Sequence, residues 1–382
     1  MRLLKIALVH DWVTGFRGGE RVLDHLAHRY PEADLFTLLH IPGRSTEAID
    51  ALRVTSSPIG RIPGAERHYR KLLPLFPWAI RRFDLRGYDL VISTSHAVAK
   101  SVRIPRGTAH LSYCFTPMRY IWDQSDAYLG RGLKRWAASP LIAALRRFDV
   151  ATSNAAHVTR FVAISNEVAG RIQRHYGRDA SVVAPPVDLS WIETASDPAE
   201  DFYLLVSGFV PYKQDALAVD TFRDLRRRLV VVGDGPGRAA LQRSAPPNVE
   251  FTGHVDEARL ASLYQRCRAL VYPQREDFGL IAVEAQAAGR PVIAYSAGGS
   301  LDSIRPLPEA EASSSLAYED APTGVFFERP DSTALALAIE RFEKAEARFD
   351  AKRIRLWAER FSPSHFDAAF DREVAMCMEA VS

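Results

Sequence analysis

Short apolar segments alternate with helical patterns of apolar and polar residues along most of the chain. In the first half, the segments with strand character are 5–10, 34–38, 89–93, 110–113, 161–164 and 181–184. In the second half they are 202–207, 229–232, 249–251, 269–272, 291–294 and 324–326. Apolar strands separated by helices are typical of parallel sheets that helices cover on both faces. The pattern therefore predicts an α/β protein with two parallel sheets, each in a Rossmann-like domain.

A turn-rich segment separates the two series of strands. Two prolines at 185–186 follow the first series, and the residues up to Asp201 are acidic and rich in turn formers. Helical patterns close the chain over 332–359 and 364–380, with Ser362-Pro363 between them. Because 382 residues exceed the usual size of a single core, we predict domains over 1–187 and 201–361, with a terminal helix over 362–382.

Composition and charge narrow the class of protein. The chain is 47% hydrophobic and 25% charged, as in folded proteins, and its formal net charge of +3 is too small to indicate a nucleic-acid partner. Its three cysteines are far apart in the sequence, which fits a reducing compartment. The apolar start is short, and no segment has the length of a membrane span. We expect a cytoplasmic protein.

One segment, 61–86, is strongly basic. It carries seven basic residues against two acidic ones, and they flank an apolar run from Leu72 to Ile80. Basic residues around an apolar patch fit an anionic membrane surface, to which the protein would attach peripherally, or a lipid-linked ligand. The alternative is a core segment with a solvated basic flank, and the sequence leaves both open.

Two carboxylates flank a predicted helix start after the strand at 269–272. Glu276 lies in the loop, and Glu284 lies on the helix that opens at 278–280. Loops at the carboxyl ends of parallel strands bind ligands, and the free amides of a helix start suit a phosphate. The two carboxylates could then hold hydroxyl groups on either side of a diphosphate. Alternatively, they are solvated cap and helix residues.

Three further loops follow predicted strands. Lys213 lies in the loop after the strand at 202–207, where its charge would neutralise a diphosphate. Gly18 and Gly19 lie between the first strand and the first helix, where glycine permits close approach of a ligand. His96 follows the strand at 89–93 and could bind a hydroxyl group or take a structural role.

The string around the two glutamates, 272–293, resembles the signature of retaining GT-B glycosyltransferases of family 4. The resemblance implies that Glu276 orients the donor sugar, Glu284 holds the ribose and Lys213 binds the phosphates. It also implies that His96 contributes to catalysis and that the remaining donor-binding positions are Gly18, Gly19, Val255, Phe278, Gly279 and Leu280. The family's GT-B fold has two Rossmann-like domains facing a central cleft, and its last helix crosses back to the first domain.

A second segment, 113–123, resembles a narrower group of mannosyltransferases that assemble surface polysaccharides. Its aromatic residues are either a platform for an acceptor sugar or part of the core, and Arg119 and Tyr120 are the candidate acceptor-binding residues. Two positions depart from the pattern. Gly208 stands where the family usually has a phosphate-binding arginine, for which Arg119 or Arg160 could substitute, and Phe115 stands where the group often has histidine.

The resemblance implies a retaining transfer of a hexose from a nucleotide diphosphate sugar, with GDP-mannose favoured, to a glycan or polyprenyl-linked saccharide in polysaccharide or lipopolysaccharide biosynthesis. We expect no metal and no cofactor besides the donor, because no Asp-x-Asp motif follows a predicted strand. Two alternatives stay open. One is a nucleotide-sugar epimerase or hydrolase of the same fold. The other is a non-catalytic, nucleotide-sugar-binding subunit of a polysaccharide assembly complex.

Overall fold

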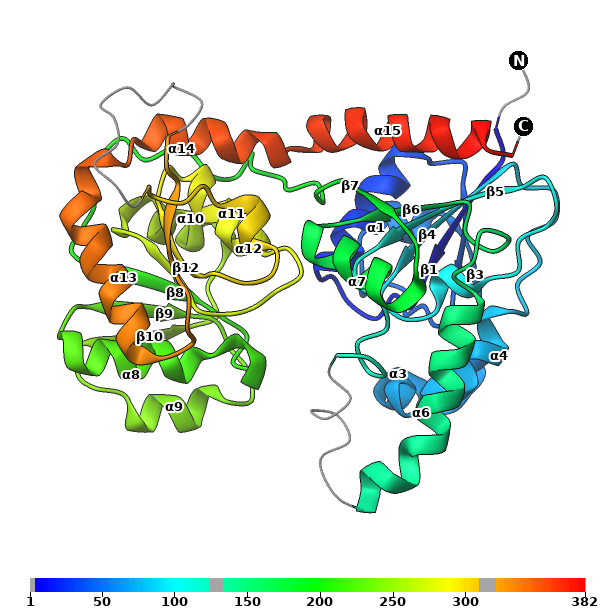
Figure 1. Cartoon of the computed structure of the whole chain (residues 1–382), viewed down its shortest axis with the longest axis horizontal. Helices are drawn as coiled ribbons and strands as arrows, with labels where there is room; N and C mark the ends of the chain where they lie inside the picture. The colour runs from blue at the N-terminus through cyan, green and yellow to red at the C-terminus, as the bar shows by residue number, and fades with distance from the viewer. Residues whose placement is uncertain (1–3, 124–132, 309–320, 382) are drawn as a thin grey trace. The chain divides into compact units, whose positions relative to one another are not determined.

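The computed structural model describes residues 4–123, 133–308 and 321–381. The chain forms two compact units (Figure 1). The first unit combines Met1–Pro186 with Ser364–Ser382, and the second unit is Val187–Pro363. Each unit has its own parallel sheet, which confirms the predicted two-sheet α/β architecture.

The sheet of the first unit has seven parallel strands in the order β3-β2-β1-β4-β5-β6-β7. The strands are β1 Ile6–His10, β2 Asp34–Thr37, β3 Arg53–Ser56, β4 Leu90–Ser95, β5 Ala109–Cys114, β6 Arg160–Ala163 and β7 Ala180–Val182. The pattern of apolar residues did not predict β3. This edge strand has mostly exposed or half-buried polar residues, so it lacks the apolar run that marked the others.

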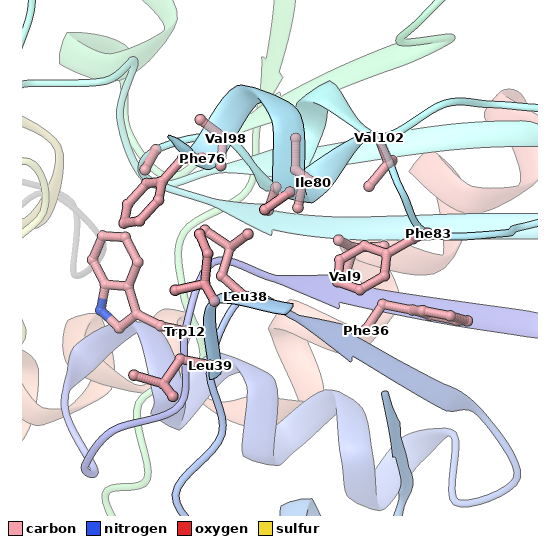
Figure 2. Packing of buried hydrophobic residues seen from close by; sticks show 14 of the residues in the cluster. Val9, Trp12, Phe36, Leu38, Leu39, Phe76, Ile80, Phe83, Val98 and Val102 are labelled. Carbon is pink, nitrogen blue, oxygen red and sulfur yellow. The ribbon is translucent and has the colours of Figure 1, made fainter. Parts of the chain in front are cut away.

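Helices and 3₁₀ turns connect these strands. They are α1 Gly18–Arg29, α2 Glu47–Ala51, η1 Pro58–Arg61, α3 Ala65–His68, η2 Tyr69–Leu75, α4 Phe76–Ile80, η3 Ala99–Ser101, α6 Leu133–Ala151 and α7 Asn166–Tyr176. Figure 2 shows the core between the sheet and α4, where Phe76 and Ile80 pack over Val9 and Leu38. The apolar run at 72–80 therefore belongs partly to the core.

The last helix, α15 (Pro363–Glu379), is part of the first unit. Its Phe366 and Phe370 are buried against Tyr113 of β5, with ring centroids 5.7 and 5.9 Å away. Its acidic residues bind basic partners on other elements: Asp367 contacts His25 of α1 at 2.7 Å, and further ion pairs join Asp371 to Arg29 and Glu373 to Arg160. Apolar and ionic contacts together attach the end of the chain to this sheet.

The sheet of the second unit has six parallel strands in the order β10-β9-β8-β11-β12-β13. The strands are β8 Tyr203–Val206, β9 Leu229–Val232, β10 Val249–Gly253, β11 Leu270–Tyr272, β12 Val292–Tyr295 and β13 Gly324–Phe327. The connecting elements are η4 Pro211–Lys213, α8 Asp215–Leu225, α9 Arg238–Ser244, α10 Glu257–Arg266, α11 Leu280–Ala287 and α12 Ser300–Ser303. Figure 1 shows α8 on one side of this sheet and α10 and α11 on the other.

One helical prediction was too long. The segment 332–359 is not one helix: α13 (Ser332–Ala345) ends in the 3₁₀ turn η6 (Glu346–Arg348), and α14 (Ala351–Ala358) follows, before the turn η7 (Glu359–Phe361). Asp350 caps α14 by accepting from the Arg353 amide at 2.9 Å. A side-chain cap of this kind starts a new helix inside an otherwise continuous helical pattern.

Each sheet has one point where the order of its strands reverses. In the first unit it lies between β1 and β4, and in the second between β8 and β11. Helices leave such neighbouring strands toward opposite faces, so the loops at their carboxyl ends diverge and leave room for a ligand. A ligand is therefore expected at the loops after β1 and β4 and at those after β8 and β11.

Candidate functional site

The loops after β8 and β11 of the second unit bring two predicted residues into contact. The Lys213 ammonium, at the end of η4, forms an ion pair with Oε1 of Glu276. The Tyr272 hydroxyl, at the end of β11, donates to Oε2 of Glu276 at 2.6 Å. Burial raises the pKa of Tyr272 well above its usual value, so the phenol remains a donor. The Lys213 and Glu276 side chains are 11% and 21% exposed, so the pair remains open to a ligand.

Glycines hold the Glu276 loop in place through close backbone contacts. Gly279 has φ +96°, and a Cβ atom there would lie 2.4 Å from the Tyr272 hydroxyl. Gly298, with φ +79°, would place a Cβ 2.3 Å from the Glu276 carbonyl oxygen, and the Gly299 amide donates to that oxygen at 2.8 Å. The glycine pair after β12 therefore has a structural role that its turn-like sequence did not reveal.

The start of α11 offers backbone donors beside this pair. Gly279 precedes the helix and provides no side-chain cap. The backbone amides of Phe278, Gly279 and Leu280 have no acceptor among the residues that the structure describes. Phe278 is buried and packs edge-on against Phe361, 5.6 Å between ring centroids. Uncapped amides at a helix start attract anions.

Glu284 takes a different position from Glu276. It lies on the second turn of α11, is 5% exposed, and accepts a hydrogen bond of 3.0 Å from the Tyr264 hydroxyl of α10. The solvated-carboxylate alternative is thereby wrong for Glu284. Val255, the predicted base-reading position, lies half-buried between β10 and α10.

The missing arginine position is sterically open. A Cβ atom at Gly208 would meet no atom within 4 Å, and its φ is not in the left-handed region. The neighbouring loop is tightly packed, because a Cβ at Gly235 would lie 2.0 Å from the Gly208 carbonyl oxygen. Arg160 does not fit the role of substitute: it lies at the amino end of β6 in the first unit and forms an ion pair with Glu373 of α15.

In the first unit, the loops after β1 and β4 are joined by a buried carboxylate. Asp11 is fully buried and accepts hydrogen bonds from the consecutive backbone amides of 96–99, at 2.7, 2.8, 2.6 and 2.7 Å. No sequence motif marks Asp11; its only signal in the sequence is its place directly after the first strand. These bonds fix the turn that carries His96.

His96 lies between Asp11 and an aromatic ring. Its Nδ1 is 3.3 Å from Oδ2 of Asp11, and its ring packs edge-on against Trp12 with centroids 4.4 Å apart. Burial lowers the pKa of His96, Asp11 opposes this effect, and the charges of Arg119 and Arg70 lower it further. A neutral imidazole at pH 7 can donate or accept a hydrogen bond to a hydroxyl group.

A second histidine, which no sequence motif marks, lies beside it. His10 is fully buried at the end of β1, with Nδ1 2.7 Å from the Thr94 hydroxyl, and burial lowers its pKa to about 3. Gly19 of α1 faces this ring, since a Cβ there would lie 3.7 Å from His10 Cε1 and 3.4 Å from Phe115. Gly18 is the first residue of α1. The glycine loop, His96 and Phe115 thus surround His10.

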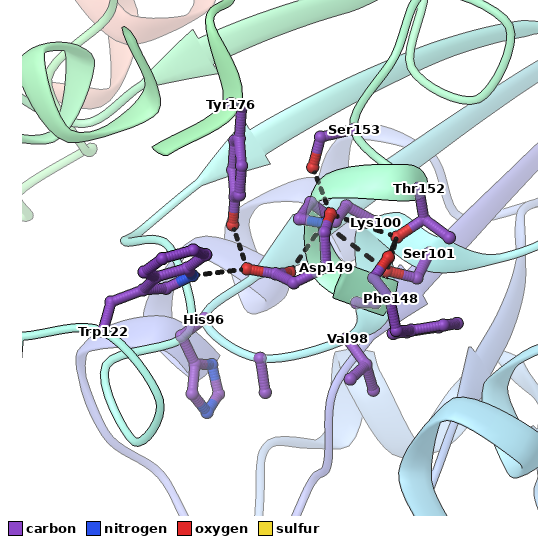
Figure 3. Close-up of polar contacts among 12 residues, drawn as sticks. His96, Val98, Lys100, Ser101, Trp122, Phe148, Asp149, Thr152, Ser153 and Tyr176 are labelled. Atoms are coloured by element: carbon purple, nitrogen blue, oxygen red, sulfur yellow. Dashed lines mark hydrogen bonds and ion pairs between the residues drawn. The ribbon is translucent and has the colours of Figure 1, made fainter. Parts of the chain in front are cut away.

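A buried polar network supports the same region (Figure 3). The Lys100 ammonium, on the turn after His96, is 2.9 Å from Oδ1 of Asp149 on α6. The Trp122 indole and the Tyr176 hydroxyl both donate to Oδ2 of Asp149 at 2.8 Å. An ion pair buried with its remaining hydrogen bonds satisfied gives a fixed geometry. This network anchors the turn of His96 and the 113–123 segment to α6.

The aromatic segment 113–123 is largely core. Tyr113 is fully buried and donates to the Val183 carbonyl at 2.9 Å, and Met118 and Ile121 are also buried. This supports the core alternative for these residues. Arg119 and Tyr120 are half-buried, so they stay candidate acceptor-binding residues.

The described residues show neither a metal-binding cluster nor a membrane-spanning helix. Within 4–123, 133–308 and 321–381, no three or more His, Cys, Asp or Glu side chains are grouped as they would be to hold a metal ion. None of the helices in those ranges is both long and apolar enough to cross a membrane.

Comparison with known families covers most of the chain. The family described as Glycosyltransferase Family 4 matches residues 16–191, and the family described as Glycosyl transferases group 1 matches residues 192–356. The two matches meet near the boundary between the units. The second contains Lys213, Glu276 and Glu284, and the first contains His96.

Curated relatives align over part of their length. The chain is 28% identical over 202 residues to the O-antigen chain mannosyltransferase C of Escherichia coli, covering 50% of each protein. It is 36% identical over 151 residues to the GDP-mannose-dependent alpha-mannosyltransferase of Mycolicibacterium smegmatis, covering 38% of this chain and 40% of that one. The chain therefore spans half or less of the length of these relatives.

A solved structure extends the likeness of fold to nearly the whole chain. HepE of Anabaena, in its complex with UDP, superposes with a TM-score of 0.67 at 15% sequence identity, covering 98% of this chain and 100% of that one. At this identity the likeness concerns the fold alone. It agrees with the two parallel sheets described above, which are those of a GT-B protein.

Proposed function

The chain belongs to the family 4 glycosyltransferases of GT-B fold, and from this premise we propose that it transfers a hexose from a nucleotide diphosphate sugar to a glycan or lipid-linked acceptor. One observation carries the proposal: Lys213 and Glu276 meet at the strand-order reversal of the second sheet, beside the uncapped start of α11. A cation, a carboxylate and free amides in one place are the groups needed to hold a sugar diphosphate.

Charge neutralisation is the main task of this site. When the bond between the anomeric carbon and the phosphate oxygen breaks, negative charge accumulates on the leaving diphosphate. The Lys213 ammonium and the amides of Phe278 to Leu280 would stabilise that charge. The diphosphate would share the ammonium with Glu276, whose second oxygen stays bound to Tyr272. Glu276 would then face the sugar hydroxyls, and Glu284 the ribose.

Retention of configuration follows, in this proposal, from attack on the same face. Both oxygens of Glu276 are engaged, by Lys213 and Tyr272, which disfavours this carboxylate as a covalent nucleophile. The acceptor oxygen would instead bond to the anomeric carbon on the face that the diphosphate leaves. The proton of the acceptor hydroxyl would pass to the leaving phosphate oxygen, so no enzymic base is required.

The donor and acceptor are narrower proposals. GDP-mannose is favoured because two relatives are described as mannosyltransferases, one of them dependent on GDP-mannose. On the acceptor side, neutral His96 is half-buried and offers a hydrogen-bonding group to a sugar hydroxyl. Arg119 and Tyr120 would complete that site.

Calorimetric titration with a panel of donors tests the proposal. The panel is GDP-mannose, UDP-glucose, UDP-N-acetylglucosamine and UDP-galactose, with EDTA present to remove metal ions. We expect one donor to bind selectively, and its affinity to fall at least tenfold in Lys213→Ala and in Glu276→Ala, because each removes a charged contact.

Matched variants separate the site from general effects of charge. Lys344→Ala and Glu257→Ala remove exposed charges from α13 and α10 of the same unit and should leave donor affinity within twofold of wild type. If no donor binds, or if all four variants bind equally well, the proposed donor site is wrong. Binding with release of an epimerised or free sugar, and no transfer to any acceptor, would favour the epimerase or hydrolase alternative.

A further inference from the structure

A pocket of about 720 Å³ opens in the first unit, at the basic segment 61–86. Its lining comes from α4 with the loop after it, residues 77–86, and from the loop at 103–105. These loops lead into the amino ends of β4 and β5, whereas His96 follows the carboxyl end of β4. Because the strands are parallel, the pocket lies at the opposite edge of the sheet from His96.

The pocket concentrates positive charge. Four arginines and one aspartate line it, a net charge of +3. Asp84 is bound to Arg86. The other three arginines of the pocket have no carboxylate partner among the residues that the structure describes; they are Arg81, Arg82 and Arg103. Burial lowers the pKa of Arg81, and the nearby charge of Arg103 lowers it further. An anion in the pocket would relieve this repulsion.

An exposed tryptophan lines the pocket, and an exposed leucine directly precedes α4. Trp78 is 51% exposed, and the guanidinium of Arg82 lies 5.0 Å from the centre of its ring. Leu75, one turn earlier, is 43% exposed. A ligand in the charged pocket would therefore also contact the ring of Trp78.

We infer that this pocket binds the phosphate group of a phosphate ester, held by Arg81, Arg103 and Arg82. Guanidinium groups match phosphate oxygens with paired hydrogen bonds, and unpaired arginines are available for them. A lipid headgroup and a soluble phosphate ester share this chemistry. A headgroup would also place Trp78 and Leu75 at a membrane surface, where such side chains are favoured. The inference does not depend on the proposed donor site.

Chemical protection of the arginines tests the inference on the intact chain. Phenylglyoxal modifies accessible guanidinium groups, and peptide mass spectrometry reports the extent at each position. Vesicles of phosphatidylglycerol or free glycerol 3-phosphate should slow modification of Arg81 and Arg103 at least fivefold. Arg106, exposed on the same loop but outside the pocket lining, should be much less affected.

The pattern of protection identifies the source of the phosphate. Protection by vesicles alone indicates a lipid headgroup, and protection by glycerol 3-phosphate indicates a soluble ester. Protection by neither overturns the inference. Equal protection by phosphatidylcholine vesicles also overturns it, because shielding would then not depend on anionic charge.

A double variant gives an independent measure. Arg81→Gln combined with Arg103→Gln should weaken binding of the protecting ligand about tenfold. Arg243→Gln combined with Arg259→Gln removes the same charge from exposed positions of the second unit and should change binding less than twofold. Circular dichroism verifies that both double variants are folded. Equal binding by the two would contradict a site at Arg81 and Arg103.

Discussion

Glu276 has one charged and one neutral partner, and this difference shapes its role. Lys213 contributes a mobile charge on a flexible chain, whereas Tyr272 contributes a neutral donor fixed at the end of a buried strand. A diphosphate can attract the ammonium without displacing the phenol. The carboxylate would therefore keep its orientation when its charge partner turns toward the ligand.

Gly208 stands where the resemblance implies a phosphate-binding arginine, and an arginine there is sterically permitted. Gly208→Arg should tighten binding of the nucleotide diphosphate about three- to tenfold, because it adds a charged contact to the phosphates. Titration calorimetry measures this, with Gly208→Gln as a control for size without charge. Equal affinity in both variants would show that phosphates do not approach residue 208.

Gly279 supports the site because it has no side chain and adopts a positive φ. Gly279→Ala would place a Cβ within 2.4 Å of the Tyr272 hydroxyl in a backbone conformation with φ +96°. We expect a loss of about 2 kcal/mol or more in the free energy of unfolding, together with weaker donor binding. Urea denaturation checks the first effect. Gly170→Ala, on an exposed face of α7 with free space around it, should be neutral or slightly stabilising.

Sequence could predict residues at this scale only where a motif marks them. Lys213 and Glu276 were found because each follows an apolar strand, and loops after parallel strands converge. Asp11 and His10 also end a strand, but their roles depend on partners more than 80 positions away, at 94–99. No local pattern in the sequence predicts such a pairing.

At the scale of elements, helix α15 joins the end of the chain to the first sheet. Phe370 is fully buried there against Tyr113. Phe370→Ala should cost about 3–5 kcal/mol in the stability of the first unit, because it leaves a cavity between helix and sheet. Met376→Ala, at a position 43% exposed, should change stability by less than about 0.5 kcal/mol.

Hydrogen exchange locates the effect of Phe370→Ala. Amides of β5 in the first unit should lose protection, while those of β12 in the second unit should keep theirs. Equal loss of protection in both strands would contradict the assignment of α15 to the first unit.

Most strands and helices could be predicted from the sequence because buried parallel strands are apolar along their whole length. The exceptions have physical reasons. Strand β3 lies at the sheet edge and is polar, and the break between α13 and α14 depends on a cap at Asp350 inside a helical pattern. Ends of strands differed by one or two residues. Strand β4 extends to Ser95, for example, because its backbone pairing with β5 continues past the apolar run.

For the whole molecule, the histidines are unevenly divided between the units. Eleven are present, and only His254 belongs to the second unit. In the first unit, burial lowers the pKa of His10 to about 3 and that of His110 to about 4. Below pH 6.5 the histidines of the unfolded chain are protonated, whereas His10 and His110 in the native chain stay neutral until the pH falls much lower. Because the unfolded chain then binds more protons than the native chain, acid favours unfolding of the first unit.

Calorimetry between pH 7 and pH 5 tests this asymmetry. The free energy of unfolding of the first unit should fall with pH by up to about 1.4 kcal/mol per pH unit for each such histidine, while the second unit changes little. The substitution His110→Gln should weaken the pH dependence of this free energy of unfolding. The substitution His28→Gln, at an exposed position of α1, should leave the pH dependence unchanged. Parallel behaviour of the two units would contradict the explanation.

The central claim, that Lys213 and Glu276 support transfer from a nucleotide sugar with retention, is tested most directly by the anomeric form of the product. Proton NMR of the methyl glycoside formed from GDP-mannose, with methanol as a trapping alcohol and EDTA present, would show it. We predict methyl α-mannoside, formed at least a hundredfold more slowly by Glu276→Gln and by Lys213→Ala, and normally by Lys344→Ala. A β-glycoside, or undiminished turnover in the first two variants, would contradict the account.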